Sequence, residues 1–172
     1  ADDLLGTISE KLKSVSDLDI VIASGDMDTL QLVEDKKIQV YTLKKGINDT
    51  ILYDEEKVVE RFGFLPKYLP DYKGLRGDPS DNIIGVKGIG EKTATTLIST
   101  YHTIEDLYKN INNNKKSLTD WKKIGITERI FNILKEGEDE AVFSKTLATI
   151  RKDAPIDFVL PEKRWKDGVD RD

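Results

Sequence analysis

Two hydrophobic periods run along this chain, and they occupy different parts of it. Short apolar runs rich in branched residues predict strands at 19–24, 37–43 and 50–53. Elsewhere apolar residues recur at spacings of three and four, which is typical of amphipathic helices. These helical ranges are 2–15, 54–62, 67–75, 91–101, 103–111, 127–135 and 138–147. The pattern predicts strands early and helices late, with a turn at 45–48, a polar loop at 112–116 and an extended tail beyond residue 150.

The first predicted strand ends beside two acidic residues. Its apolar centre at 20–23 is typical of a buried strand in a parallel sheet. Functional sites of open α/β sheets lie beyond the carboxyl ends of their strands. Asp26 and Asp28 follow at such an end. They are either metal ligands or a helix cap with a spare acid, and their spacing alone does not decide between the two.

A second acidic pair stands before a glycine-rich turn. Asp78 and Asp81 are three residues apart, so both can face one cation. The turn carries Gly85, Gly88 and Gly90 and opens the helix predicted at 91–101. Glycines let backbone N–H groups approach an anion closely. A cation site beside an anion site is what chemistry on a phosphate ester needs.

The composition excludes several kinds of catalytic and metal-binding site. There are no cysteines, so disulfides, thiolate zinc sites and cysteine nucleophiles are excluded. The single histidine, His102, lies at a predicted helix end, where a surface or capping role is favoured over catalysis. No apolar run approaches the ~20 residues that cross a membrane, so no membrane partner is expected. The absence of cysteine fits a reducing cytoplasm, which is the expected location.

The charge is distributed unevenly along the chain. The net charge of −5 argues at face value against a nucleic-acid partner. However, residues 1–35 carry nine Asp or Glu against two Lys, and residues 85–125 carry seven Lys against four Asp or Glu. This asymmetry suits a metal site beside a phosphate-binding surface. Ordinary solvated faces would give the same counts.

Carboxylates remain as the candidate ligands, without His or Cys. The six candidates are Asp2, Asp3, Asp26, Asp28, Asp78 and Asp81. Such an all-oxygen set favours magnesium or manganese over zinc. Two like charges ~4 Å apart repel by about 4 kcal/mol at an effective dielectric constant of 20, so gathered acids would require cations or raised pKa values. If the six acids are scattered instead, they form an ordinary acidic surface.

Four motifs in order resemble the 5′ nuclease domain of bacterial DNA polymerase I and its flap-endonuclease relatives. The strongest is LRGDPSDN at 75–82 followed by GVKGIGEKTA at 85–94. ADDLLG at 1–6 is similar to the family's Glu-Ala-Asp-Asp motif without its Glu, and SGDMD at 24–28 matches its Asp-x-Asp strand end. SKTLATI at 144–150 resembles the segment that closes the domain.

The resemblance implies an α/β fold. Residues 1–66 would form the C-terminal part of a PIN-like core with parallel strands, and residues 67–150 a mainly helical helix-hairpin-helix subdomain that binds DNA. Residues 151–172 would be a tail or linker toward a polymerase region. The implied activity is hydrolysis of DNA phosphodiesters at 5′ ends and flaps on duplex DNA, with two divalent ions, magnesium or manganese.

The resemblance also implies roles for single residues. Asp2 and Asp3 would serve the first metal ion. The second would be served, directly or through water, by Asp26, Asp28, Asp78 and Asp81. The duplex backbone would be held without reading its sequence by Gly85, Lys87, Gly88, Gly90, Lys92 and Thr93. In this family such a hairpin can also hold a potassium ion.

The family's N-terminal half has no counterpart in this sequence, nor does the glutamate expected before Ala1. We therefore expect a fragment that binds duplex DNA weakly and lacks full nuclease activity alone. Two other functions stay open: a non-catalytic helix-hairpin-helix module that binds DNA, and a PIN-type ribonuclease. Convergence of Asp78 with Asp26 and Asp28 would favour the nuclease over the module.

Overall fold

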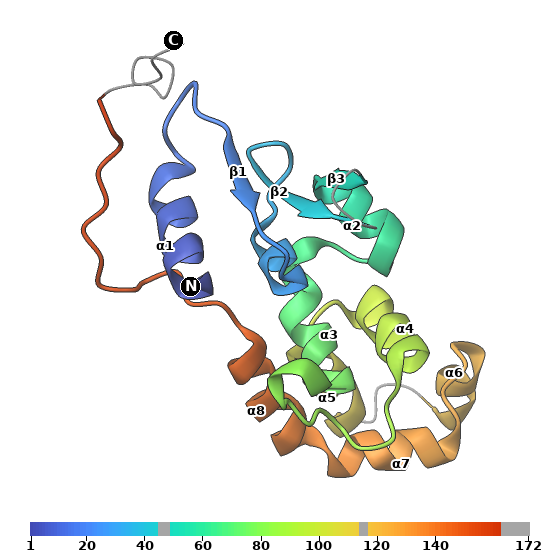
Figure 1. The fold of residues 1–172 in the computed structure, drawn as a ribbon. Helices are drawn as coiled ribbons and strands as arrows, with labels where there is room; N and C mark the ends of the chain where they lie inside the picture. The colour runs from blue at the N-terminus through green and yellow to red at the C-terminus, as the bar shows by residue number, and fades with distance from the viewer. Residues whose placement is uncertain (45–48, 114–116, 163–172) are drawn as a thin grey trace.

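The computed structural model describes residues 1–44, 49–113 and 117–162 (Figure 1). The predicted turn at 45–48 lies outside these residues, as do the end of the polar loop at 114–116 and the end of the tail at 163–172.

A three-stranded sheet occupies the N-terminal part of the chain. Its strands are β1 (Ile20–Ala23), β2 (Ile38–Leu43) and β3 (Thr50–Tyr53), in the order β1-β2-β3. β1 and β2 are parallel, with Ile22 opposite Val40, and β2 and β3 are antiparallel. The predicted strands and the parallel pair are confirmed.

The expectation that β1 is a buried strand holds only in part, at Ile22. Ile22 and Val40 are buried, but Val21, Tyr41 and Leu43 on the opposite face are 55%, 42% and 56% exposed. Side chains alternate between the two faces of a sheet, and within the described residues the side chains on one of these faces are buried and those on the other are exposed. A run of apolar residues therefore did not mean burial on both sides.

Among the residues that the structure describes, four helical elements accompany the sheet in the N-terminal part of the chain. They are α1 (Asp2–Leu12), η1 (Met27–Leu32), α2 (Glu55–Phe62) and η2 (Pro66–Tyr68). α1 ends earlier than the predicted 2–15 and packs through the small residues Gly6, Thr7 and Ser9, whereas Leu4 of its apolar stripe is 46% exposed. A Cβ at Gly6 would collide with Ile150 and the Arg151 carbonyl, so the absence of a side chain allows this close contact.

The C-terminal part is helical, as predicted. It contains α3 (Leu69–Arg76), η3 (Pro79–Asp81), α4 (Glu91–Tyr101), α5 (Ile104–Asn112), α6 (Leu118–Lys123), α7 (Glu128–Glu136) and α8 (Glu138–Ala148). α4 has the predicted bounds. α6 was not predicted, although Ser117 and Asp120 form a capping box at its start.

α3 is the centre of the molecule, with α4, α5 and α8 packed around it (Figure 1). Gly74 brings α8 close, because a Cβ there would meet the Ala141 carbonyl and the Lys145 side chain. The buried Asp71 accepts the N–H of Ile104 at the start of α5, 2.9 Å away. One hydrophobic core therefore joins the sheet to the helices, from Ile22 to Ile150.

The tail from 151 to 162 runs in extended form beside α1 (Figure 1). The Ala154 N–H donates to Thr7 Oγ1 at 3.0 Å, and Lys11 Nζ donates to the Ile156 carbonyl at 2.6 Å. Every helix in the part of the chain that the structure describes is too short or too polar to cross a membrane.

Candidate active site

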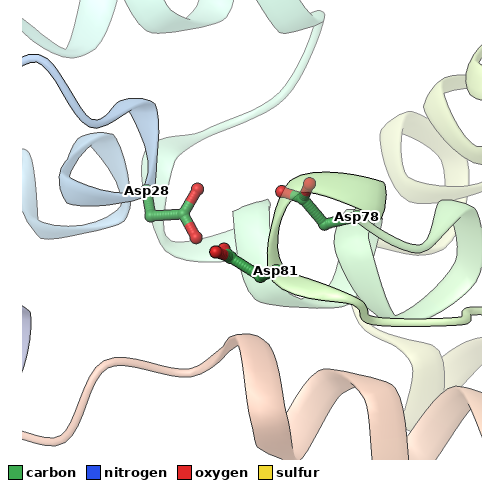
Figure 2. A group of neighbouring side chains, drawn as sticks. All are labelled: Asp28, Asp78 and Asp81. Carbon is green, nitrogen blue, oxygen red and sulfur yellow. The ribbon is translucent and has the colours of Figure 1, made fainter.

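The first acidic pair sits where β1 ends. Asp26 caps η1, because its Oδ1 accepts the N–H of Asp28 at 2.9 Å. Asp28 lies in the first turn of that element and its side chain extends toward the loop after α3 (Figure 2). Of the two interpretations of this pair, the structure shows the cap at Asp26, and it leaves the side chain of Asp28 outside that cap.

The second acidic pair lies in the loop that follows α3. Asp78 Oδ1 accepts the Ser80 N–H at 3.0 Å and the Ser80 hydroxyl at 2.5 Å. Asp78 and Ile83 also exchange backbone hydrogen bonds, each of 2.8 Å. These bonds fix the turn that contains Asp81, so the two carboxylates are held on the side of the loop that faces Asp28 (Figure 2).

Three carboxylates converge from these two segments. One oxygen from each of Asp28, Asp78 and Asp81 lies within 4.8 Å of the others. Asp28 and Asp78 are half-buried and Asp81 is exposed. The set contains only oxygen donors, which is the chemistry that magnesium and manganese prefer. The residues present therefore fit a hard divalent cation.

Lys73 of α3 contacts two of these acids. Its ammonium forms ion pairs with Asp28 and, at 2.6 Å, with Asp78. Burial would raise the pKa of Asp78, but the bonds from Lys73 and Ser80 outweigh it and lower this pKa to about 2. For Asp28, burial outweighs the effect of Lys73 and raises the pKa. Burial alone would lower the pKa of Lys73, but its bonds to the two acids raise it.

Two adjoining hollows surround the three carboxylates. A cleft of about 790 Å³ is lined by Asp26, Asp28, Asp78 and Asp81 together with Lys73, Arg61 and Arg76. A second hollow of about 310 Å³ is lined by Asp2, Asp3, Asp26, Asp28 and Asp81. All six acids singled out in the sequence therefore lie on one connected surface, since Asp26, Asp28 and Asp81 line both hollows.

Three of the six acids lie outside the group of three. Asp2 and Asp3 occupy the first turn of α1, and Asp26 is engaged as a cap. Asp3 Oδ1 accepts the Arg151 N–H at 2.9 Å, which ties the start of α1 to the tail. Asp3 therefore makes a hydrogen bond within the protein that the sequence did not indicate.

The glycine turn between α3 and α4 exposes only part of its backbone. Val86 and Ile89 are buried, and they anchor the turn against the core. Lys87, Gly88, Gly90 and Lys92 are exposed, and Thr93 is half-buried. Among the described residues, none accepts a hydrogen bond from the N–H groups of Lys87, Gly88 or Gly90. These donors can therefore face an anion outside the protein.

Gly85 has a different environment from the other glycines of this turn. It is buried, and its N–H donates to Ser144 Oγ of α8 at 3.0 Å. Its φ of +65° disfavours any other residue, and an added Cβ would collide with the backbone of Arg76 and Gly77. Its N–H is therefore engaged within the protein, and a contact of Gly85 with DNA stays a prediction.

Sequence reasoning missed four residues around the site: Lys73, Arg61, Arg76 and Ser144. The first three line the cleft with the acids, and Ser144 holds Gly85. A signal for Lys73 exists, since it lies between Tyr72 and Leu75, both buried, in a predicted helix five residues before Asp78. A lysine on the inner side of a helix requires a buried partner.

Two family models together match residues 1–170 of the chain. "5'-3' exonuclease, N-terminal resolvase-like domain" covers residues 1–63, and "5'-3' exonuclease, C-terminal SAM fold" covers residues 64–170. The chain belongs to the 5'-3' exonuclease family. The resemblance stated from the motifs is thereby confirmed.

Curated relatives of this 5'-3' exonuclease family member carry two names. DNA polymerase I of Caldicellulosiruptor bescii is 42% identical over 169 residues, which are 97% of this chain and 18% of that protein. The 5'-3' exonuclease of Bacillus subtilis is 47% identical over 111 residues, which are 64% of this chain and 36% of that protein. The chain therefore spans less than a fifth of the polymerase and about a third of the exonuclease.

Solved structures show the same fold. The bacteriophage T5 5'-exonuclease, described with bound divalent zinc ions, superposes with a TM-score of 0.67 at 20% identity, over 86% of this chain and 48% of that one. The T5 flap endonuclease in a complex with DNA and metal ions gives the same TM-score, identity and coverage. The predicted α/β core followed by a helical part is confirmed.

Proposed function

We propose that this chain is part of a structure-specific 5'-3' exonuclease or flap endonuclease that hydrolyses DNA phosphodiesters with two divalent ions. The observation that carries this proposal is the convergence of Asp28, Asp78 and Asp81 from two segments of the chain. Its relatives named DNA polymerase I support a polymerase region in the parent protein.

The carboxylates would hold magnesium or manganese. Asp26, Asp28, Asp78 and Asp81 would serve one ion, directly or through water, and Asp2 and Asp3 the other. When bound, such ions neutralise the negative charge that develops on the phosphate oxygens during cleavage. The side chains of Arg61 and Arg76, on the same cleft, would attract and orient the DNA backbone beside the acids.

The turn between α3 and α4 would hold the duplex away from the point of cleavage. Its free N–H donors at Lys87, Gly88 and Gly90 face outward with the Lys87 and Lys92 ammonium groups. Contacts of this kind position the phosphate backbone and carry no sequence information. This turn would also hold a potassium ion.

Two other functions make different predictions. A non-catalytic DNA-binding module needs the turn but has no use for converging acids, and these acids favour the nuclease. A PIN-type ribonuclease needs the acids but has no use for the turn. Binding of single-stranded RNA in preference to duplex DNA would support the ribonuclease.

The test is a pair of binding measurements on the purified chain. Calorimetry with Mn²⁺ compares the wild type with Asp28→Asn and Asp78→Asn, each of which should weaken binding by about tenfold or more. Asp120→Asn is the matched control, because Asp120 lies in the capping box of α6. Fluorescence anisotropy in Ca²⁺ then compares duplex DNA with a 5′ flap, the same duplex without a flap, and single-stranded RNA.

The nuclease proposal fails if Mn²⁺ binding is absent or unaffected by both site substitutions. The DNA-binding module would then be the better description, provided that duplex binding persists. Cleavage of the flap substrate in Mg²⁺, abolished by Asp78→Asn, would support the activity directly.

A further inference from the structure

Lys73 is the most enclosed cation of the site. It lies on α3 between Tyr72 and Gly74, and the whole residue is only 8% exposed. A buried ammonium is costly unless it is paired. Its partners are Asp28 and Asp78, which belong to segments on either side of the cleft. Lys73 therefore crosslinks the two halves of the carboxylate group.

The oxygens of Asp78 are both occupied. Oδ2 accepts from Lys73 at 2.6 Å, and Oδ1 accepts from the N–H and hydroxyl of Ser80. The Ser80 N–H is held in place by the backbone turn of η3, whereas Lys73 has a long side chain with several rotatable bonds. Of these two partners, Lys73 is the one that can move.

A divalent ion and the Lys73 ammonium would compete for the same oxygens. An ion bound by Asp28 and Asp78 would lie close to an ammonium that contacts both acids. Two positive charges that contact the same carboxylates repel each other strongly in a site that is partly shielded from water. The ion and the lysine therefore do not share Asp28 and Asp78 without rearrangement.

We propose that Lys73 is an internal cation that holds Asp28 and Asp78 together in the metal-free protein and leaves them when a divalent ion binds. This inference rests on the proposed function, since it takes the three carboxylates as a metal site. Lys73 then has two effects: it stabilises the metal-free fold, and it lowers the affinity of the site for metal.

Lys145 offers a matched comparison. Its ammonium also bridges two acids, Asp71 at 2.7 Å and Glu105 at 2.8 Å. These acids are not in the group of three at the site, which is the only cluster of at least three metal-ligating side chains among the described residues. Loss of Lys145 should therefore destabilise the fold without changing metal affinity.

The experiment measures Mn²⁺ affinity by calorimetry and thermal stability in EDTA. Lys73→Met should bind Mn²⁺ at least about tenfold more tightly than the wild type. Its melting temperature in EDTA should fall by several degrees, and Mn²⁺ should raise it more than it raises that of the wild type. Lys73→Arg keeps the charge and should bind Mn²⁺ within about threefold of the wild type. Lys145→Met should melt earlier with an unchanged Mn²⁺ affinity.

The possible results separate the proposed role of Lys73 from the existence of the metal site. If Lys73→Met binds Mn²⁺ as the wild type does, or more weakly, the proposed exchange of Lys73 for a divalent ion is refuted, while the metal site stands. If neither protein binds Mn²⁺, the metal site and the exchange both fail.

A measurement on the wild type avoids any folding defect of the variants. Side-chain NMR signals of Lys73 should shift during a Mg²⁺ titration, to an extent that follows occupancy of the site. The signals of Lys145 serve as an internal reference and should stay unchanged. Unchanged Lys73 signals at saturating Mg²⁺ would overturn the proposal.

Discussion

Identical side chains take different roles at this site according to their neighbours. Asp26 and Asp28 are two residues apart, yet Asp26 caps η1 and Asp28 joins the carboxylate group. Asp78 caps η3 and also belongs to the carboxylate group. One of its oxygens binds Ser80 and the other binds Lys73. Residue type alone therefore does not decide which of these roles an aspartate takes. The direction of the side chain, set by the local backbone, makes the difference.

Asp78 should titrate at an unusually low pH in the metal-free protein. Its pKa is lowered to about 2, against about 3.9 for an unperturbed aspartate, mainly because Lys73 and Ser80 bind the ionised form despite partial burial. Its contribution to stability is therefore present above pH ~4 and is lost as the pH falls toward ~2. NMR titration of the carboxyl carbon in EDTA measures this pKa.

The same titration in Lys73→Met is the informative control. Without the ammonium, burial should dominate and the pKa of Asp78 should rise toward or above its ordinary value. A midpoint that stays near 2 in this variant would show that Ser80 alone accounts for the shift.

At the scale of the element, the turn between α3 and α4 separates two kinds of glycine. Gly85 is buried and lies in the left-handed region, where its N–H bonds to Ser144. Gly90 is exposed, has a φ of −94°, and has no atom within 4 Å of an added Cβ. The first glycine is needed by the fold, whereas the second leaves room for a ligand.

Alanine substitutions should distinguish these two glycines. Gly85→Ala forces a collision with the backbone of Gly77 and should cost at least about 1–3 kcal/mol of unfolding free energy. Gly90→Ala should cost less than about 1 kcal/mol. If the turn holds DNA through its backbone, Gly90→Ala should nevertheless weaken duplex binding, as measured by anisotropy at fixed salt. Unchanged affinity would remove Gly90 from the DNA interface.

The lysine of this turn should act through charge. Lys87→Gln should lower the slope of log K against log salt concentration by about 0.9 for duplex DNA, because one phosphate contact is lost. Lys36→Gln is a suitable control, since Lys36 is exposed and precedes β2, away from the carboxyl ends of the parallel strands. Equal slopes for both variants would place Lys87 outside the contact.

At the scale of the whole molecule, α8 and the segment after it connect the sheet to the helices. The buried Gln31 of η1 donates to the Ala148 carbonyl at 3.0 Å and accepts the Ile150 N–H at 2.9 Å. Gly74 and Ser144 link the same helix to α3 and to the glycine turn. The acids near β1 are thereby held at a fixed distance from those after α3.

Gln31→Ala should lower the unfolding free energy by about 2–4 kcal/mol, because it leaves two buried backbone groups without partners. Urea denaturation measures the change. Gln39→Ala is the matched control, since Gln39 is half-buried on β2, and its side chain has no hydrogen bond to another described residue. A similar loss in both variants would mean that the bridge to α8 contributes nothing specific.

Much of this architecture could be predicted because its signals are local. Periodicity gave the bounds of α4 and nearly those of α7 and α8. α6 was missed because six residues are too few for a helical period to stand out. The exposed face of the sheet was missed because a run of apolar residues does not show which other segments pack against the strand.

By itself the sequence determined the family and most of the helical and strand segments, and it singled out six candidate acids, since each of these is written in contiguous motifs or local periods. Only the tertiary structure decided which acids converge, because Asp28 is brought to Asp78 and Asp81 by packing between distant segments. Packing also places Lys73 between Asp28 and Asp78, 45 positions from the first, and turns the N–H of Gly85 inward to Ser144. Such pairings depend on how the whole chain closes its core, which no single stretch of sequence encodes.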